Sequence, residues 1–230
     1  MDLNSTALAS LVRTELIPQD GVTKFSPNRR FATVYSEGSP ADTVYFLDAG
    51  LVKVHKRGDE GKEIILQILW SGMLFGEQAL TGEGIREVSA EILQEGAIYV
   101  IPRDLFQNFC DGKPNLWRMI SEMIIGRKKQ LEKKIELLCL QDVEYRILYY
   151  MAELAETFGM KMDGQEYSIP LSQGELASMV GATRETTSTT LNALARRGLL
   201  RLGRRQLILP SLDHVRAAAH DRNARMAAKV

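Results

Sequence analysis

Two adjacent side chains, Arg184 and Glu185, carry hydrogen-bonding groups suited to reading DNA bases. An arginine can donate two hydrogen bonds to a guanine edge, and a glutamate can accept one from a cytosine amino group. A well-formed bidentate contact contributes about 1–3 kcal/mol of discrimination between bases. Alternatively, the two side chains could pair with each other on an ordinary protein surface. The elements that position them decide between these interpretations.

The surrounding residues, 171–186, have the pattern of a helix-turn-helix. Ser172 can cap a first helix, and Thr183 can cap a second one. Gly181 suits the turn because glycine reaches positive φ easily, and the small Ala177 lets the two helices approach closely. In this motif the N-terminal part of the second helix enters the major groove. The complete motif favours base reading over a surface ion pair.

Side chains around this motif have the chemistry to bind DNA phosphates. Two apolar runs, 199–202 and 206–209, flank a Gly-Arg-Arg turn and predict a β-hairpin wing. The last 20 residues are helical in propensity. The candidate phosphate-binding residues are Ser172, Gln173, Thr183, Thr186, Arg204 and Arg205.

The charge distribution supports the same interpretation only when the chain is divided. The 29 basic and 29 acidic residues give a net charge of zero, which by itself counts against a nucleic-acid partner. Residues 171–230, however, hold ten basic and four acidic residues, a balance of +6, and the other 170 residues balance this at −6. The C-terminal part therefore has the charge expected of a phosphate-binding surface.

Composition excludes several other classes of protein. A 45% hydrophobic chain of 230 residues can form a packed core, and it has no apolar run of the ~20 residues that span a bilayer. The N-terminus is too polar for a signal peptide, so we expect a cytoplasmic protein without a membrane partner. Two cysteines, Cys110 and Cys139, and three histidines predict neither a disulfide framework nor a metal site.

The first half of the chain has the pattern of short strands separated by glycines. Strands are expected at 44–47, 51–57, 63–69, 88–93 and 97–101, with turns at 48–50 and 58–61. Val52 and Val54 alternate with Lys53 and His55, which predicts a half-buried strand with its polar side outward. Many short strands of this kind favour a closed or nearly closed antiparallel structure.

A helical pattern runs from Pro114 to about Leu140. Its apolar residues are spaced as in a coiled-coil seam, which predicts a dimer helix. The alternative is a long helix lying on its own domain, but the basic runs 127–129 and 133–134 argue for a partly solvated helix. These patterns give three parts, 1–112, 113–141 and 142–230, with a hinge at 140–142. The seam residues are Ile124, Leu131, Ile135 and Leu138.

The order of these parts resembles the cyclic-AMP receptor protein/FNR family of bacterial transcription regulators over about residues 25–212. The resemblance rests on Gly38…Gly50, the hairpin 59–63, the run Phe75-Gly76-Glu77 and, most specifically, residues 180–186. It implies an α+β fold: an N-terminal antiparallel β-roll (a cyclic-nucleotide-binding-like jelly roll), a long dimerisation helix and a C-terminal winged helix-turn-helix. It also implies a homodimer on near-palindromic double-stranded DNA, with RNA polymerase as a further partner.

The same resemblance assigns base reading to the positions of Arg184, Glu185, Ser188 and Thr189. Many family members have arginine where this chain has Thr189, so the third base of the half-site differs in its contact. The run Thr186-Thr187-Ser188-Thr189-Thr190 is unusual, because such residues are poor helix formers. Packing through methyl groups and contacts to phosphates are the roles we expect for it.

The candidate effector pocket departs from the cyclic-AMP pattern. Where relatives that bind cyclic AMP have Arg-Ser-Ala, this chain has Val88-Ser89-Ala90, and it lacks the charge-assisted contact that a cyclic phosphate needs. We therefore do not expect cyclic-nucleotide binding. The absence of an N-terminal cysteine cluster excludes an iron–sulfur cluster, and a single strand histidine, His55, does not support haem.

A second comparison within the family concerns regulators that sense 2-oxoglutarate. Arg86, Arg127 and Glu132 lie at or near the positions those regulators use, and two arginines could clamp a dicarboxylate. The alternative is that all three are solvated charges, with Glu77 placed to repel an acidic ligand. The candidate pocket comprises Gly76, Glu77, Arg86, Ser89, Arg127, Leu131 and Glu132.

The sequence thus predicts a homodimeric, sequence-specific DNA-binding regulator without catalytic residues. It is expected to respond to a small-molecule effector other than cyclic AMP or to act without ligand. One rival is an enzyme of cupin-like β fold, which needs clustered histidine and carboxylate ligands in the roll. The other is a ligand-binding signalling or scaffold protein whose C-terminal domain binds protein.

Overall fold

The computed structural model describes residues 3–26, 29–58, 61–82, 84–162 and 166–227. The chain forms two compact units, Met1–Gln130 and Leu131–Val230. This division falls inside the long helix, whereas the three-part division at 112/113 and 141/142 stays a prediction. Residues 59–60 of the expected turn at 58–61 lie outside the described residues, as do residues 163–165.

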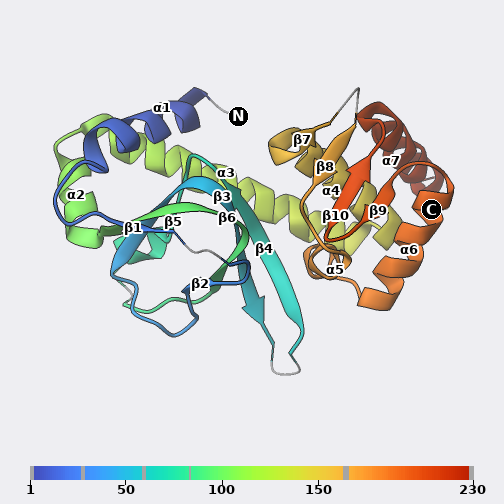
Figure 1. The fold of residues 1–230 in the computed structure, drawn as a ribbon, viewed down its shortest axis with the longest axis horizontal. Coiled ribbons are helices and arrows are strands. Elements are labelled where there is room, and N and C mark those ends of the chain that lie inside the picture. Colours follow the sequence, from blue (N-terminus) through green and yellow to red (C-terminus); the bar gives the residue numbers. More distant parts are fainter. Residues whose placement is uncertain (1–2, 27–28, 59–60, 83, 163–165, 228–230) are drawn as a thin grey trace. The chain divides into compact units, whose positions relative to one another are not determined.

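The first unit is an antiparallel sheet covered by helices (Figure 1). Strand β6 pairs with β1, β2 and β3, and β3 in turn pairs with β4 and β5. This confirms the predicted N-terminal antiparallel β structure. Its elements are α1 (Leu3–Leu11), a π-helical turn (Val12–Leu16), β1 (Thr23–Phe25), β2 (Thr33–Tyr35), β3 (Thr43–Arg57), β4 (Glu63–Trp70), β5 (Met73–Phe75), a 3-10 turn (Glu77–Leu80), β6 (Ser89–Pro102), α2 (Arg103–Asp111) and the part of α3 (Pro114–Leu140) up to Gln130.

Strands β3 and β6 are each continuous where the sequence suggested a break. Gly50 has φ +96°, and its pairing with β6 is irregular on both sides. A Cβ on Gly50 would lie 2.6 Å from the Gln94 carbonyl oxygen, and one on Gly96 would lie 1.9 Å from that of Ala49. The expected turn at 48–50 is therefore wrong: the glycines let two long strands bend and cross in close contact.

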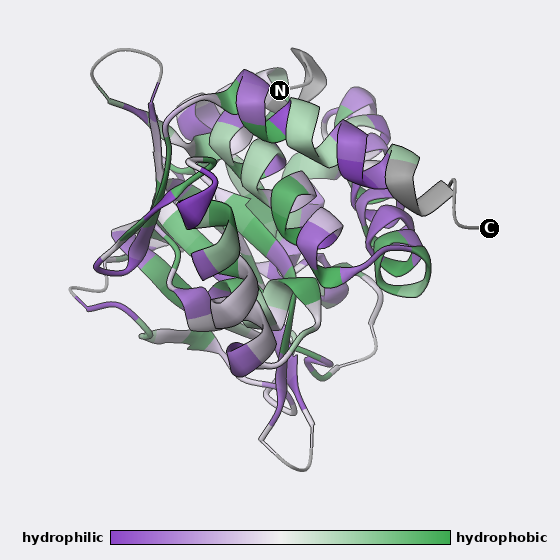
Figure 2. Cartoon of the chain, turned by 90° about the vertical axis from the view of Figure 1, so that its right-hand side faces the viewer, coloured by the Kyte–Doolittle hydropathy of each residue, from purple (hydrophilic) through white to green (hydrophobic). Residues whose placement is uncertain are grey.

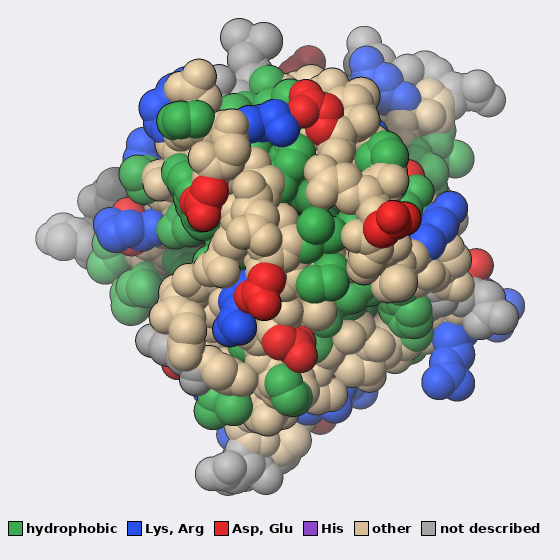
Figure 3. Space-filling view, turned by 90° about the vertical axis from the view of Figure 1, so that its left-hand side faces the viewer, with side chains coloured by type: hydrophobic (Ala, Val, Ile, Leu, Met, Phe, Trp, Pro, Cys, Tyr) green, Lys and Arg blue, Asp and Glu red, His purple; other side chains and the backbone are tan. Residues whose placement is uncertain are grey.

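Two clusters of buried side chains hold this unit together. One lies between the sheet strands and includes Tyr45, Leu47, Phe75 and Ile98. The other joins α1 and the π-helical turn to β3, α2 and the first turns of α3. On the face seen in Figure 3, basic and acidic side chains are interspersed over the surface.

The second unit contains a bundle of helices and a small antiparallel sheet of order β7-β8-β10-β9. In Figure 2 hydrophobic and hydrophilic residues alternate along the helices. Among the described residues, no helix combines the length and apolar composition that crossing a membrane requires. The elements are α4 (Val143–Phe158), β7 (Met160–Lys161), β8 (Tyr167–Ile169), α5 (Gln173–Val180), α6 (Arg184–Arg196), β9 (Arg201–Gly203), β10 (Gln206–Leu209) and α7 (Leu212–Ala227).

Helix α3 carries the predicted seam. Ile124, Leu131 and Ile135 are exposed, at 43%, 43% and 61%. Leu138 is only partly exposed, because it lies against Gly181 of the second unit. An exposed apolar row is what a helix pairing with a second copy would present, while Leu138 already has a contact within its own unit.

The basic runs of α3 do not make it a wholly solvated helix. Lys134 is buried at 6% exposure, and its Nζ donates to the Met179 carbonyl oxygen at 2.7 Å. Burial, aided by Arg146, lowers the pKa of Lys134 to about 8. Arg127 is likewise buried. The expectation of solvated basic runs is therefore wrong for these two residues, because each is hydrogen-bonded to a backbone carbonyl far away in sequence.

Candidate nucleic-acid interface

Helix α5 begins and ends with the signals expected of the first helix of the motif. Ser172 and Glu175 form a capping box: Glu175 N–H donates to Ser172 Oγ at 3.2 Å, and Ser172 N–H donates to Glu175 Oε2 at 2.6 Å. The helix ends at Gly181, which has φ +64°. The predicted capping role of Ser172 is confirmed, and its partly exposed hydroxyl keeps a phosphate-binding capacity.

Helix α6 starts at a second cap and presents its first turn to solvent. Thr183 Oγ1 accepts from Thr186 N–H at 3.1 Å, and the two hydroxyl oxygens lie 2.9 Å apart. Arg184, Glu185 and Thr189 are exposed, and Ser188 is partly exposed. The four predicted base-reading side chains therefore lie at the N-terminal end of one helix, where the structure pairs neither Arg184 nor Glu185 with the other.

The run of hydroxyl residues in α6 has a structural explanation. Thr187 is fully buried, at 0% exposure, so its methyl group packs in the core of the unit. Thr190 Oγ1 donates to the Thr186 carbonyl oxygen at 2.8 Å, a common bond for a helical threonine. The expected role of methyl packing is confirmed for Thr187.

Gly174 lies next to the Arg184 side chain, although nothing in the sequence pattern assigned it to the interface. A Cβ on this residue would lie 3.5 Å from Arg184 Nε and 3.8 Å from Arg184 Cζ. The guanidinium of Arg184 therefore rests against the first turn of α5, next to the partly exposed Gln173. Only the position of Gly174, one residue after Gln173 in the first helix, could have indicated this contact.

The predicted wing is confirmed as the β9–β10 hairpin. Gly203 pairs with Gln206, so Arg204 and Arg205 form its two-residue turn, and both are exposed. Arg205 has φ +58°, a conformation that L-residues other than asparagine and aspartate rarely adopt. The wing thus presents two guanidinium groups to solvent at the cost of backbone strain.

Most of the candidate effector residues lie in the first unit, and two of them, Arg86 and Arg127, have internal hydrogen bonds there. Arg86 has 1% exposure, and its Nη1 donates to the Gly76 carbonyl oxygen at 2.9 Å. Its guanidinium also lies 4.6 Å from the centre of the Tyr35 ring. Burial, followed by the charge of Glu77, raises the pKa of Tyr35, so this phenol stays neutral.

Buried Arg127 and partly exposed Glu77 form a second contact in this region. Arg127 Nη1 lies 2.6 Å from Glu77 Oε1, and Nη2 donates to the Leu74 carbonyl oxygen. Burial alone would raise the pKa of Glu77, but the charge and hydrogen bond of Arg127 outweigh it, so the pKa lies below its usual value. The interpretation of Arg86 and Arg127 as solvated charges is wrong, because the fold pairs both internally.

The other candidate effector residues lie in different settings. Ser89 Oγ accepts from Glu37 N–H at 2.9 Å and so helps to hold a loop. Leu131 and Glu132 are exposed and belong to the second unit, whereas Gly76, with φ +75°, belongs to the first. The first unit therefore brings Gly76, Glu77, Arg86 and Arg127 together, while Leu131 and Glu132 are part of the second unit.

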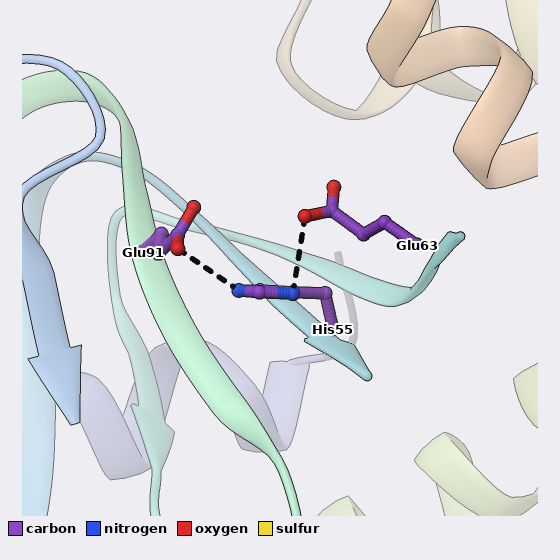
Figure 4. Close-up of side chains that lie close together, drawn as sticks. All are labelled: His55, Glu63 and Glu91. Carbon is purple, nitrogen blue, oxygen red and sulfur yellow. Dashed lines mark ion pairs between the residues drawn. The ribbon is translucent and has the colours of Figure 1, made fainter. Parts of the chain in front are cut away.

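A further polar cluster lies on β3, β4 and β6 (Figure 4). Lys53 and His55 are buried, at 3% and 1% exposure, which corrects the expectation of an outward polar side. His55 Nδ1 lies 3.2 Å from Glu63 Oε2, and Nε2 lies 3.4 Å from Glu91 Oε1. Burial, then the charge of Lys53, lowers the pKa of His55. The histidine is therefore neutral at pH 7.

Three of these groups, His55, Glu63 and Glu91, are close enough together to hold a metal ion. Their carboxylates, however, already have cationic partners: Lys53 Nζ lies 2.6 Å from Glu63 and 3.1 Å from Glu91, and Arg57 contacts both. Two carboxylates and two cations balance without a further positive charge. The cluster is thus explained as a buried ion-pair network.

Comparisons with known proteins agree with this architecture. A family model described as a cyclic nucleotide-binding domain matches residues 28–113, and one described as a Crp-like helix-turn-helix domain matches residues 145–218. A cyclic nucleotide-binding domain followed by a Crp-like helix-turn-helix domain is the arrangement of a transcription regulator. The chain belongs to the cyclic-AMP receptor protein/FNR family of transcription regulators.

The individual relatives are regulators of different kinds. The CRP-like cAMP-activated global transcriptional regulator of Mycobacterium tuberculosis is 28% identical over 184 residues, 80% of this chain and 82% of the relative. The global nitrogen regulator of Synechococcus elongatus is 27% identical over 181 residues, 77% and 82% of the two chains. The crystal structure of a CRP/FNR-family regulator from Thermus thermophilus matches with a TM-score of 0.73 and 25% identity, over 87% and 99%.

Proposed function

We propose that this protein is a homodimer that binds a near-palindromic DNA site and regulates transcription in the cytoplasm, in contact with RNA polymerase. The observation that carries the proposal is the exposed, capped first turn of α6 with Arg184 and Glu185, next to a wing with Arg204 and Arg205. Dimerisation through α3 is supported by the exposed row of Ile124, Leu131 and Ile135. Two recognition helices about 34 Å apart would then meet successive major grooves.

In this proposal the groups of the interface divide into two roles. Arg184, Glu185, Ser188 and Thr189 read bases, because they stand on the part of α6 that enters the groove. Ser172, Gln173, Thr183, Thr186 and the two wing arginines bind phosphates, which position the protein without reading sequence.

The effector side of the proposal is that cyclic AMP does not control this chain. Arg86 and Arg127 already hold carbonyl oxygens and the Glu77 carboxylate, and Val88 stands where relatives that bind cyclic AMP have arginine. A protein whose buried guanidiniums are internally paired can keep this region folded without an anionic ligand. The arrangement supports control by a different small molecule or activity without one.

Selection from random duplexes followed by gel-shift titration tests the DNA function. The Arg184→Ala variant should lose about 1–3 kcal/mol of discrimination at one base pair of each half-site. Arg204→Ala should weaken binding to all sequences alike. It should also reduce the slope of log K against log salt concentration by about one for the phosphate contact that is removed. The absence of any salt-sensitive, sequence-selective complex would refute the DNA function.

A thermal-shift screen tests the effector side, because a ligand that binds the native state raises the melting temperature. Cyclic AMP should leave both the melting temperature and the DNA affinity unchanged, with 2-oxoglutarate measured in parallel. A saturable shift with cyclic AMP would refute this part of the proposal while leaving the DNA function intact.

A further inference from the structure

Helix α7 continues beyond the residues that the helix-turn-helix family model matches. The helix-turn-helix family model ends at residue 218, whereas α7 runs from Leu212 to Ala227. The residues after 218 are not free of contacts: two of them, Arg222 and Asn223, bond to the junction between α3 and α4 within the second unit. This extra helical segment therefore braces a place where two helices meet.

Arg222 makes the principal contact of this brace. Its Nε donates to Asp142 Oδ2 at 2.8 Å, its Nη2 bonds to the same oxygen, and its Nη1 lies 3.5 Å from Glu144 Oε2. Next to it, Gln141 Nε2 donates to Asn223 Oδ1 at 3.2 Å. All three junction residues, 141, 142 and 144, are thus held by α7.

Asp142 has a second role, because the same carboxylate also caps the start of α4. Its Oδ1 accepts from Tyr145 N–H at 2.9 Å as the N-cap of α4. Burial would raise the pKa of Asp142, but the Arg222 hydrogen bond and the Tyr145 N–H lower it below its usual value. One carboxylate therefore fixes where α4 starts and how α7 lies against that start.

Glu144 extends the connection to the recognition helix. Arg197, the residue that caps the C-terminal end of α6, places its Nη1 2.6 Å from Glu144 Oε1. The carboxylate of Glu144 is thus shared between α7 and the end of α6. Bonds run from α7 through the junction and the first turn of α4 to the helix that carries Arg184.

We propose that Arg222 is a positioning residue: it holds the α3–α4 junction and thereby sets the direction in which α6 is presented. This inference rests on the proposed DNA function, and it assigns to α7 a role in half-site spacing without a DNA contact. The ion pairs are partly exposed, at 36% and 31% for Arg222 and Asp142. Partly exposed pairs contribute little to global stability, so the effect should appear in geometry rather than in melting temperature.

The test compares full-length variants with a matched control. Arg222→Ala removes the brace, and Arg222→Lys keeps the charge but not the fork of donors. Arg216→Ala is the control, because Arg216 pairs with Glu156 and so joins the same two helices away from the junction. Both alanine variants remove one positive charge from α7, so a general electrostatic effect would change them equally.

Hydrogen exchange of the free protein is the first measurement. Backbone amides of residues 145–147 should exchange at least about fivefold faster in Arg222→Ala, stay unchanged in Arg216→Ala, and lie between in Arg222→Lys. Equal exchange in Arg222→Ala and the unsubstituted protein would overturn the proposal. Because no DNA is present, this result stands even if the DNA function fails.

Binding to selected sites whose half-site spacing is changed by one or two base pairs is the second measurement. The unsubstituted protein and Arg216→Ala should prefer the selected spacing by about tenfold or more, and Arg222→Ala should lose most of this preference. The same preference in Arg222→Ala would overturn the positioning role. Absence of DNA binding by the unsubstituted protein would instead refute the proposed function, leaving the brace to be decided by hydrogen exchange.

Discussion

Gly181 connects the turn of the helix-turn-helix to helix α3, and substituting it gives a prediction that can be worked out from the structure. An alanine here must adopt φ +64°, and its Cβ would lie 2.6 Å from Leu138 Cδ2. The left-handed conformation costs about 1–2 kcal/mol in a residue with a Cβ. Displacing a partly exposed leucine methyl group costs about 1 kcal/mol, the lower end of overpacking penalties. We therefore expect Gly181→Ala to lower the free energy of unfolding of this unit by about 2–3 kcal/mol.

A double-mutant cycle separates the two contributions. In the Leu138→Ala background the Cβ has space, so Gly181→Ala should cost only its backbone part, and the two changes should couple by about 1 kcal/mol. Ile135→Ala is the matched control, because Ile135 is 61% exposed on the same helix, and its coupling to Gly181→Ala should vanish. Gly181→Asn should cost less than Gly181→Ala, because asparagine tolerates this conformation.

Urea unfolding followed by circular dichroism and by fluorescence provides the assay. Both tryptophans, Trp70 and Trp117, lie in the first unit, so their fluorescence should show an unchanged transition while the helical signal of the second unit shifts. An unaltered Gly181→Ala variant would refute the strain argument. Strict additivity with Leu138→Ala would refute the contact between the two residues.

Three further predictions concern single residues. The pKa of buried His55 is lowered in the folded protein, so below pH 6.5 the unfolded chain binds a proton at this residue more readily than the folded one. The free energy of unfolding should therefore fall towards pH 5 by up to about 1.4 kcal/mol per pH unit. His55→Gln should remove this part of the slope in urea titrations at several pH values, and an identical slope would contradict the buried, neutral histidine. Arg205→Gly should raise the melting temperature by removing about 1 kcal/mol of strain, yet weaken DNA binding as Arg204→Ala does; a lower melting temperature would count against the strained turn. Thr187→Val should stabilise the protein by about 1 kcal/mol, because Thr187 Oγ1 is buried without a hydrogen-bond partner among the described residues; calorimetry showing destabilisation would indicate a bound partner.

The parts that the sequence predicted well depend on local signals. The caps Ser172 and Thr183, the turn at Gly181 and the arginines of the wing are each determined by residues within a few positions of one another. Their interactions form within one turn or one hairpin, so spacing alone reveals them. The same holds for the periodicity that predicted α3.

The parts that the sequence could not predict depend on partners far along the chain. Lys53 is buried because Glu91 lies beside it, and Arg127 because Glu77 does. Polarity patterns place such residues on a surface, since the compensating charge comes from another strand or helix. The sequence also predicts a turn at 48–50 where β3 is a continuous, bent strand. A glycine that permits two strands to cross cannot be distinguished in sequence from one that permits a turn.

The crossing of β3 and β6 has a consequence for how this protein can diverge. Gly50 and Gly96 each face the backbone of the other strand at distances that no side chain can occupy. A rotamer change cannot relieve these contacts, because the opposing atoms are main-chain carbonyl groups, and a change at one glycine cannot be compensated by a change at the other. In a library of random variants scored for folding, both positions should admit glycine only, whereas the exposed wing turn should accept many residues. For folding alone, the two glycine positions, which carry no side chain, would then be invariant. The charged positions of the wing turn, which we propose to bind DNA, would vary.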